Sequence, residues 1–169
     1  MANTFELIAS STVGAGGASS IDFTSIPSTY TDLAIYLSAR QSRSEVVSNT
    51  RIEFNGSSAN LSCRYLQGTG SAAVSSSSAS YLFAASPANT ATANTFGNSY
   101  IYIPNYAGST NKSVSWDAVT ETNATGAEAY LVAGLWSNTA AITSIKLSSL
   151  SSDNFMQYST AYLYGVKNA

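Results

Sequence analysis

The segment Tyr30-Thr-Asp-Leu-Ala-Ile-Tyr-Leu-Ser-Ala-Arg40 decides the fold class of this chain. Its side chains Leu33, Ile35 and Leu37 recur at every second residue, so they project from the same side of an extended backbone. Polar residues and Tyr36 alternate with them on the other side. A two-residue period predicts a half-buried β-strand, because the apolar side chains of a helix would recur at every third or fourth position.

The same period continues in both directions along the chain. It predicts further short strands at 5–9, 21–24, 50–54, 60–66, 98–104, 112–120, 128–137, 141–147 and 156–166. A turn at Asn55-Gly56 makes 60–66 the returning partner of 50–54. The segment 128–137 is apolar on both sides, which predicts a central or covered strand. Eight to ten strands without a convincing helix indicate an all-β, antiparallel β-sandwich, with a jelly roll as the preferred version.

The chain of 169 residues is long enough for one domain, so we expect 1–169 to form a single β-sandwich. A short N-terminal arm at about 1–5 precedes it. The segment 68–97 is rich in Ser, Ala and Thr and is interpreted as a long loop, with Tyr81–Ala85 as a candidate strand inside it. Cys63 is a single cysteine in an alternating run, so we expect a buried, inert thiol.

The charge content excludes several kinds of partner. Only 9% of the residues are charged and the net charge is −2, whereas about 25% are charged in typical domains. No basic patch is visible, so we expect neither a nucleic-acid partner nor a polybasic membrane contact. No signal peptide and no apolar run of membrane-spanning length are found. A neutral, hydroxyl-rich surface suits a protein that packs against copies of itself.

The residue types needed for catalysis are scarce. The chain has no histidine, which removes the commonest general base and the usual zinc ligand. We therefore expect no catalytic residue, no metal site and no cofactor. Paired carboxylates could still serve a glycosidase. The candidates are Asp117 with Glu121, Glu45 with Glu53, and Glu121 with Glu128, but charges in solvated turns and edges are the preferred interpretation.

Aromatic side chains supply the candidate contact surface. Tyrosine suits interfaces because it combines an apolar ring, a polar tip and few rotatable bonds. One group clusters at 100–106, and a second group at 158–164 is predicted to share one strand face. The surface could contact another subunit or stack on sugars, and about half of these side chains could instead belong to the core. The candidate interface residues are Phe5, Tyr100, Tyr102, Tyr106, Tyr158, Tyr162 and Tyr164.

Several stretches resemble one group of proteins. They are Ile-Pro-Ser-Thr-Tyr-Thr-Asp-Leu at 26–33, Thr-Phe-Gly-Asn at 95–98, Ile-Tyr-Ile-Pro-Asn-Tyr-Ala-Gly-Ser at 101–109, Ala-Gly-Leu-Trp-Ser-Asn-Thr-Ala-Ala-Ile-Thr at 133–143, and Gln-Tyr-Ser-Thr-Ala-Tyr-Leu-Tyr-Gly at 157–165. With them, the chain resembles small structural proteins of tailed bacteriophages, notably phages of aquatic bacteria and cyanobacteria (cyanophages). The resemblance runs from about Phe5 to the end and is loosest at 70–80. The group brings no catalytic residues.

The resemblance implies a virion component made in the host cytoplasm. One expectation is a capsid decoration, or cement, protein on the capsid surface. It would be a homotrimer that binds the major capsid protein and stabilises the assembled shell, because it binds only that state. The alternative is a tail-fibre or adhesin domain that binds host surface glycans through aromatic platforms. A glycan hydrolase is the third and weakest candidate.

Overall fold

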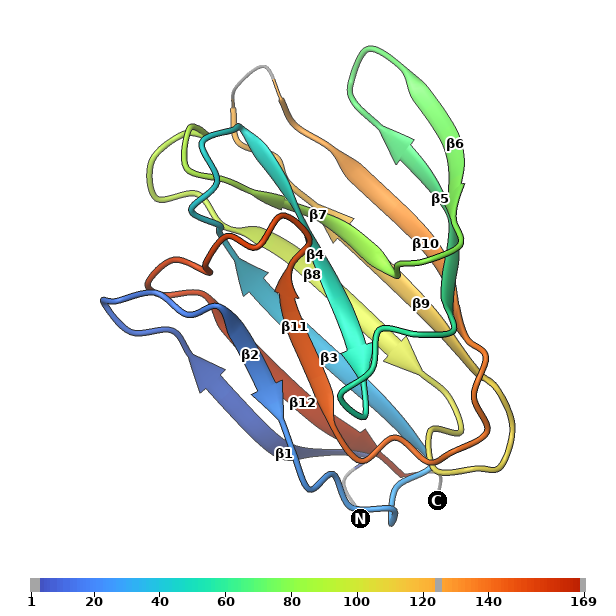
Figure 1. Ribbon diagram of the computed structural model, residues 1–169. Helices are drawn as coiled ribbons and strands as arrows, with labels where there is room; N and C mark the ends of the chain where they lie inside the picture. Colours follow the sequence, from blue (N-terminus) through green and yellow to red (C-terminus); the bar gives the residue numbers. More distant parts are fainter. Residues whose placement is uncertain (1–3, 124–125, 168–169) are drawn as a thin grey trace.

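The computed structural model describes residues 4–123 and 126–167, and within them the chain forms twelve strands and no helix (Figure 1). A larger sheet has the order β1-β12-β3-β8-β9-β10-β5-β6, and a smaller sheet has the order β2-β11-β4-β7. The predicted antiparallel β-sandwich is therefore confirmed. The strand bounds are β1 Phe5–Thr12, β2 Ser20–Phe23, β3 Asp32–Ala39, β4 Val47–Phe54, β5 Leu61–Gly68, β6 Ala73–Ser78, β7 Phe83–Pro87, β8 Gly97–Ile103, β9 Lys112–Val119, β10 Ala129–Trp136, β11 Ile145–Ser149 and β12 Thr160–Val166.

Eight of these strands have the order of a jelly roll. The strands β1, β12, β3 and β8 form one layer and face the strands β2, β11, β4 and β7. Among these eight strands, the chain changes layer at each step from β1 to β4, and again from β7 to β8, to β11 and to β12. The remaining strands, β5 with β6 and β9 with β10, all extend the larger sheet beyond β8. One layer is therefore much wider than the layer that covers it.

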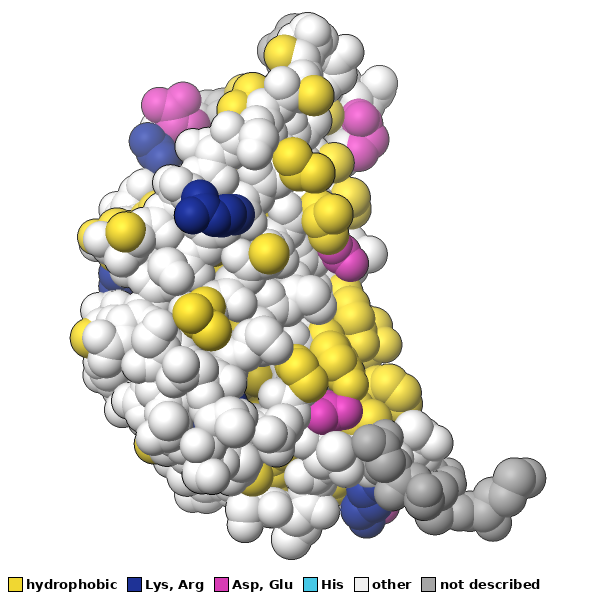
Figure 2. Space-filling view, turned by 90° about the vertical axis from the view of Figure 1, so that its right-hand side faces the viewer, with side chains coloured by type: hydrophobic (Ala, Val, Ile, Leu, Met, Phe, Trp, Pro, Cys, Tyr) yellow, Lys and Arg dark blue, Asp and Glu magenta, His cyan; other side chains and the backbone are white. Residues whose placement is uncertain are grey.

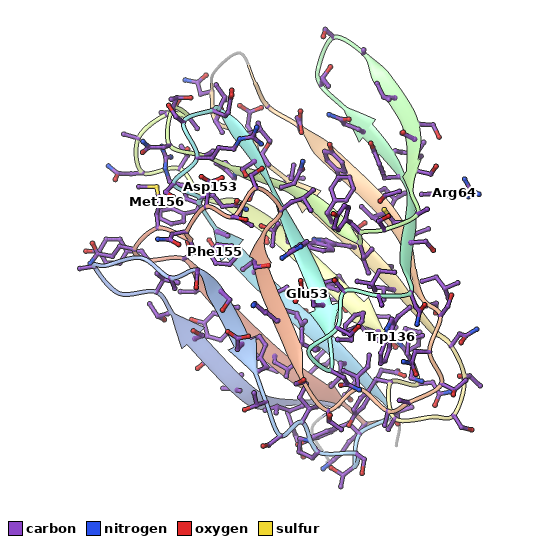
Figure 3. All side chains as sticks on the ribbon, in the orientation of Figure 1. Glu53, Arg64, Trp136, Asp153, Phe155 and Met156 are labelled. Carbon is purple, nitrogen blue, oxygen red and sulfur yellow. The ribbon has the colours of Figure 1, made fainter. Side chains whose placement is uncertain are left out.

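The core lies between the two layers. Leu33, Ile35 and Leu37 of β3 point into it and are at most 2% exposed, as the two-residue period predicts. Trp136, at the end of β10, connects the layers because its ring centroid lies 5.4 Å from that of Phe54 on β4 (Figure 3). Burial of each large apolar side chain contributes about 1.5–3 kcal/mol.

Two buried cations hold loops at the ends of the sandwich. The Arg40 guanidinium donates hydrogen bonds to backbone carbonyls in the loop before β8, among them those of Thr92 at 2.7 Å and Thr95 at 3.0 Å. The Lys112 ammonium donates to the carbonyl of Gly108 at 2.7 Å and to that of Thr110. Backbone dipoles thus satisfy charges that would be costly to bury without partners.

The segment 68–97 departs from the loop that composition predicts. It contains β6, which pairs with β5, and β7, which pairs with β4. The loop expectation is therefore wrong for β6, whereas β7 overlaps the candidate strand expected at Tyr81–Ala85. Neither shows a two-residue period, because β6 is exposed on both faces and β7 is buried on both faces. Backbone hydrogen bonds, which leave no trace in a hydropathy pattern, hold them in place.

The predicted hairpin of 50–54 with 60–66 is also wrong. The turn itself is present, since Asn55 and Gly56 adopt φ values of 53° and 71°. It closes only the bridge between Phe54 and Ser57. The chain then leaves the smaller sheet, and β5 pairs with β10 and β6 in the larger one. The inward side chains of β5 can therefore cover the wider end of the core.

Other boundaries differ by a few residues. The strand predicted at 141–147 is β11 at Ile145–Ser149, and the one predicted at 156–166 begins at Thr160. Phe5 is already paired with Val166 in the ladder of β1 and β12, and residues 1–3 of the predicted arm lie outside the described residues. The described residues contain no helix that could cross a membrane.

Candidate interaction surface

The outer face of the larger sheet, from β1 to β6, is hollowed and carries apolar side chains; it is called the concave face below. Figure 2 shows this face in profile, with a band of hydrophobic side chains along the hollow. Leu66, Leu131 and Leu7 are 57%, 55% and 54% exposed on it. The smaller sheet lies on the opposite face, so none of its described residues covers these side chains.

The strand register aligns the side chains of this face into rows. Residues that pair across antiparallel strands point to the same side of a sheet and lie next to one another. Tyr36 of β3 is paired with Tyr162 of β12 and with Tyr100 of β8. One row runs through Tyr162, Tyr36, Tyr100, Asp117, Leu131 and Leu66, and its neighbour through Leu7, Tyr164, Ala34, Tyr102, Ser115, Ala133 and Arg64.

Aromatic rings gather at the β1 end of the concave face. The ring centroid of Tyr36 lies 5.0 Å from that of Tyr100 and 5.8 Å from that of Tyr164. Phe5 packs edge-on against Tyr164 at 6.4 Å. Phe5, Tyr36, Tyr162 and Tyr164 line a shallow hollow of about 390 Å³. They form the aromatic hollow referred to below.

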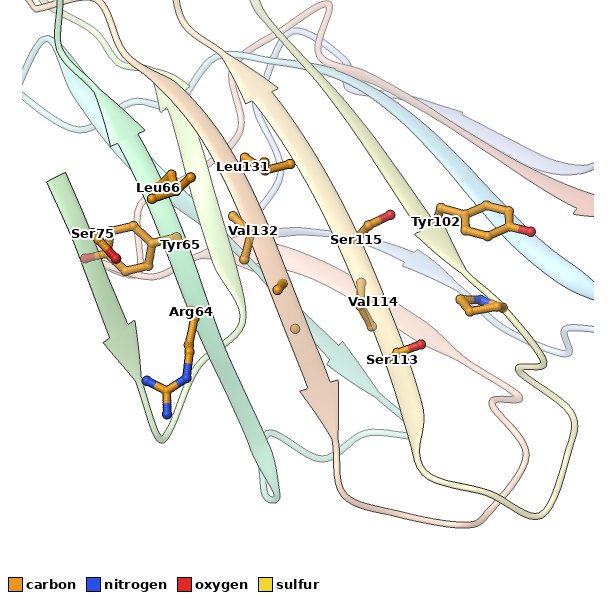
Figure 4. Close-up of a pocket in the computed structure, with 13 residues that line it drawn as sticks. Arg64, Tyr65, Leu66, Ser75, Tyr102, Ser113, Val114, Ser115, Leu131 and Val132 are labelled. Carbon is orange, nitrogen blue, oxygen red and sulfur yellow. The ribbon is translucent and has the colours of Figure 1, made fainter. Parts of the chain in front are cut away.

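A longer groove of about 580 Å³ occupies the other half of the face, above β5, β10, β9 and β8 (Figure 4). Leu66 and Leu131 form its apolar floor. Arg64 stands at one side, and Ser115 and Tyr102 stand at the other. This arrangement gives a mainly apolar surface with separated polar groups, which suits contact with a surface better than chemistry on a small molecule.

Tyr102 is fixed at the border between the groove and the aromatic hollow. Its hydroxyl donates a 2.5 Å hydrogen bond to the Asp32 carboxylate, which also accepts one from the backbone N–H of Asn105. The bond to Asp32, with burial, raises the pKa of Tyr102 to about 12. Burial also raises the pKa of Tyr100, which lies beside Tyr36 and Asp117. The Tyr102 phenol is therefore a neutral donor to the Asp32 carboxylate.

Most of the aromatic residues named from the sequence meet on this face. Phe5 belongs to β1, Tyr100 and Tyr102 to β8, and Tyr162 and Tyr164 to β12. That they form an interface stays a prediction, since the structure contains a single chain.

Two of the named tyrosines lie elsewhere. The prediction that Tyr106 is an interface residue is wrong. Its side chain is fully buried, and its hydroxyl donates a hydrogen bond to the carbonyl of Pro27. Tyr158 is exposed, but it lies in a turn with φ 72° before β12, so it does not share a strand face with Tyr162.

Sequence reasoning missed the apolar half of the surface. Leu66, Leu131 and Leu135 lie on the concave face and were not singled out. The signal was present in 128–137, which is apolar on both sides. That pattern predicts a central or covered strand, and β10 is indeed central, between β9 and β5. Its outward side chains Leu131 and Leu135 are nevertheless exposed in the part of the chain that the structure describes.

The candidate carboxylates occupy different places. Asp117 lies on the concave face, whereas Glu121 follows the end of β9 and accepts a hydrogen bond from the backbone of Asn123. Glu53 forms an ion pair with Arg51 at 3.1 Å. Burial raises the pKa of Glu128.

The described residues offer few groups for metal binding or thiol chemistry. Across residues 4–123 and 126–167, no group of three His, Cys, Asp or Glu residues is placed to hold a metal ion. Cys63 is buried, as expected, and burial raises the pKa of its thiol.

Comparison with known proteins gives little. No protein-family model matches the chain, and no curated protein matches it. Among solved structures, the chain is similar to the CBM2 module of the evolved Dit protein of Lactobacillus casei BL23 phage J-1, with 10% identity and a TM-score of 0.25. The match covers 89% of this chain and 69% of that one. A similarity of this size carries no argument about function.

Proposed function

We propose that the chain is a virion structural protein of a tailed phage, and that it acts as a capsid decoration, or cement, protein. The observation that carries the proposal is the concave face, where exposed leucine and tyrosine side chains gather along the two rows, with few charges between them. Monomeric soluble proteins rarely expose contiguous apolar patches of this kind unless a partner covers them. The sequence resemblance supplies the virion context.

The proposed occupant of the concave face is the major capsid protein. A complementary surface would be neutral, convex and partly apolar, because the rows carry few charges, among them Asp117 and Arg64. With 9% charged residues, copies can crowd on a shell without strong mutual repulsion. A protein that binds the assembled shell and not its free subunits stabilises the shell by mass action. The homotrimer implied by the resemblance stays part of this proposal.

Binding to shells assembled from the major capsid protein alone tests the proposal. The double variant Leu66→Ser and Leu131→Ser removes two half-exposed leucines from the groove, so we expect co-sedimentation to weaken at least tenfold. Val74→Ser is the matched control, because Val74 is 42% exposed but lies on the opposite face of the same sheet. Equal binding of both variants and the unaltered protein would contradict the proposal.

The aromatic hollow favours a second candidate, a tail-associated domain that binds host glycans. Tyr36 and Tyr162 are 43% and 40% exposed, and such rings can stack on the apolar faces of sugars. A glycan array decides between the two functions. Glycan binding that is lost in Tyr36→Ala and retained in Leu131→Ser supports the adhesin, whereas shell binding with no glycan signal supports the decoration protein.

A further inference from the structure

The four edge strands of the sandwich differ in how their open sides are protected. Unpaired backbone groups on an edge invite pairing with another chain, and proteins blunt them with charges, prolines, bulges or cover. β1 has a bulge and a Glu6–Lys167 ion pair of 2.7 Å. β2 has only four residues and includes Asp22. β7 is buried along its whole length and ends at Pro87.

The fourth edge, β6, has none of these devices. Its sequence Ala-Val-Ser-Ser-Ser-Ser contains no charge and no proline, and its ladder with β5 runs without a bulge. Five of its six residues are exposed and the sixth is partly exposed. Along an antiparallel ladder, every second residue turns its N–H and C=O groups away from the paired neighbour. A row of donors and acceptors therefore faces outward from β6.

The surroundings of β6 leave room for another strand. Figure 1 shows the hairpin of β5 and β6 projecting beyond the smaller sheet, so neither side of β6 is covered. A second strand can thus approach in the plane of the sheet. Exposed edge strands without charge or proline are open to such pairing.

We propose that the open edge of β6 pairs antiparallel with β6 of a second copy about a two-fold axis. Such a rotation places the donors of an antiparallel edge opposite its own acceptors, so a copy is a complete partner. The serines Ser75–Ser78 would meet small, neutral side chains across the axis. Arg64, the nearby cation on β5, would lie at least three strand spacings, or about 14 Å, from its symmetry mate. Its repulsion is screened over that distance.

The contact joins the two larger sheets into one continuous sheet and extends the concave face across the axis. It does not rest on the partner proposed for that face. On its own it gives a dimer, and if the homotrimer also forms, it joins two trimers. In each case the assembly contains an even number of chains.

Molar mass in solution tests the pairing. The unaltered protein is expected to reach the mass of an even number of chains, and Ser76→Lys is expected to halve it, because two lysines meet near the axis. Ser28→Lys, in the exposed loop between β2 and β3, is the matched control and keeps the mass of the unaltered protein. An unaltered protein that stays a single chain at millimolar concentration overturns the proposal, as does a Ser76→Lys variant of unchanged mass.

Disulfide trapping tests the pairing through the appearance of crosslinks rather than through a loss of molar mass. Single cysteines are placed along 73–78 in a Cys63→Ala background and oxidised. Antiparallel pairing about a two-fold axis puts only the one residue at the axis opposite its own copy, so crosslinking should peak at one position and fall on both sides. A flat profile, or crosslinks only to a different virion protein, would show that a second copy is not the occupant.

Discussion

At the scale of single residues, the buried Arg40 side chain shows how this nearly uncharged protein uses its few cations. Its guanidinium donates to several carbonyls of the loop that leads into β8, including those of Asn89, Ala91 and Thr92. The side chain therefore organises a loop that has no regular structure of its own.

We predict that Arg40→Met lowers the free energy of unfolding by about 2–4 kcal/mol, because the carbonyls it serves lose buried donors. Urea denaturation measures the change. Arg64→Met is the control, since Arg64 projects into solvent (Figure 3), and we expect it to stay within about 0.5 kcal/mol of the unaltered protein. Equal losses from the two variants would contradict the role of the buried carbonyl contacts.

The raised pKa of Tyr102 predicts how the free energy of unfolding changes at alkaline pH. Its pKa of about 12 in the folded protein lies above the ordinary value of 10.0, so the folded state holds the phenolic proton more tightly than the unfolded state. The resulting stabilisation is complete below pH 10 and is lost as the pH rises toward 12.

The free energy of unfolding of the unaltered protein should therefore fall between pH 10 and 12, and it should fall less steeply in Tyr102→Phe. Denaturation series at fixed pH values measure both slopes. Tyr130, whose pKa burial also raises, is unchanged in the variant and leaves part of the alkaline slope in place. Identical slopes in the two proteins would count against the Tyr102–Asp32 hydrogen bond.

A two-residue period predicts well which apolar residues of a strand point inward. It predicts poorly whether a tyrosine, with its apolar ring and polar tip, is buried. Leu33, Ile35 and Trp116 are buried as their positions in strands predict. Tyr106 is buried in a loop, where no period exists to place it. A tyrosine can satisfy its hydroxyl in a core or at a surface, so its residue type does not decide between the two.

At the scale of elements, β12 is closely covered at Gly165. A Cβ atom at this position would lie 2.2 Å from Cγ of the Tyr30 ring, which packs directly on the strand. We predict that Gly165→Ala destabilises the protein by about 1–3 kcal/mol through overpacking. Gly68→Ala, in β5 with open space around it, is the matched control and should be close to neutral in thermal unfolding. An alanine tolerated at 165 would contradict the close packing of Tyr30 on β12.

Strands that are half-buried were predictable, and strands of other kinds were not. β8 and β9 alternate strictly in burial, and they were found at nearly the right places. β6 was assigned to a loop and β7 was only a candidate strand within it, because full exposure and full burial each erase the alternation. For the same reason, the sequence pattern did not reveal β6 as an open edge strand, on which the proposed pairing of two copies depends.

At the scale of the whole molecule, composition and the two-residue period predicted the β-sandwich. They did not predict that one sheet is much wider than the other. The larger sheet depends on the long-range pairing of β10 with β5, which local sequence does not encode. That pairing places Leu131 beside Leu66 and so creates the groove of the concave face. The candidate surface is therefore a property of topology, and only its aromatic half was visible in the sequence.

The central proposal is that this chain is a virion protein and that other virion proteins cover the sandwich in its working state. The proposal requires that a phage encodes the chain. The most direct test counts copies of the chain per purified particle of that phage, by peptide mass spectrometry against the major capsid protein. We predict hundreds of copies in a fixed ratio to that protein. A handful of copies would place the chain in the tail, and none would contradict a structural role in the virion.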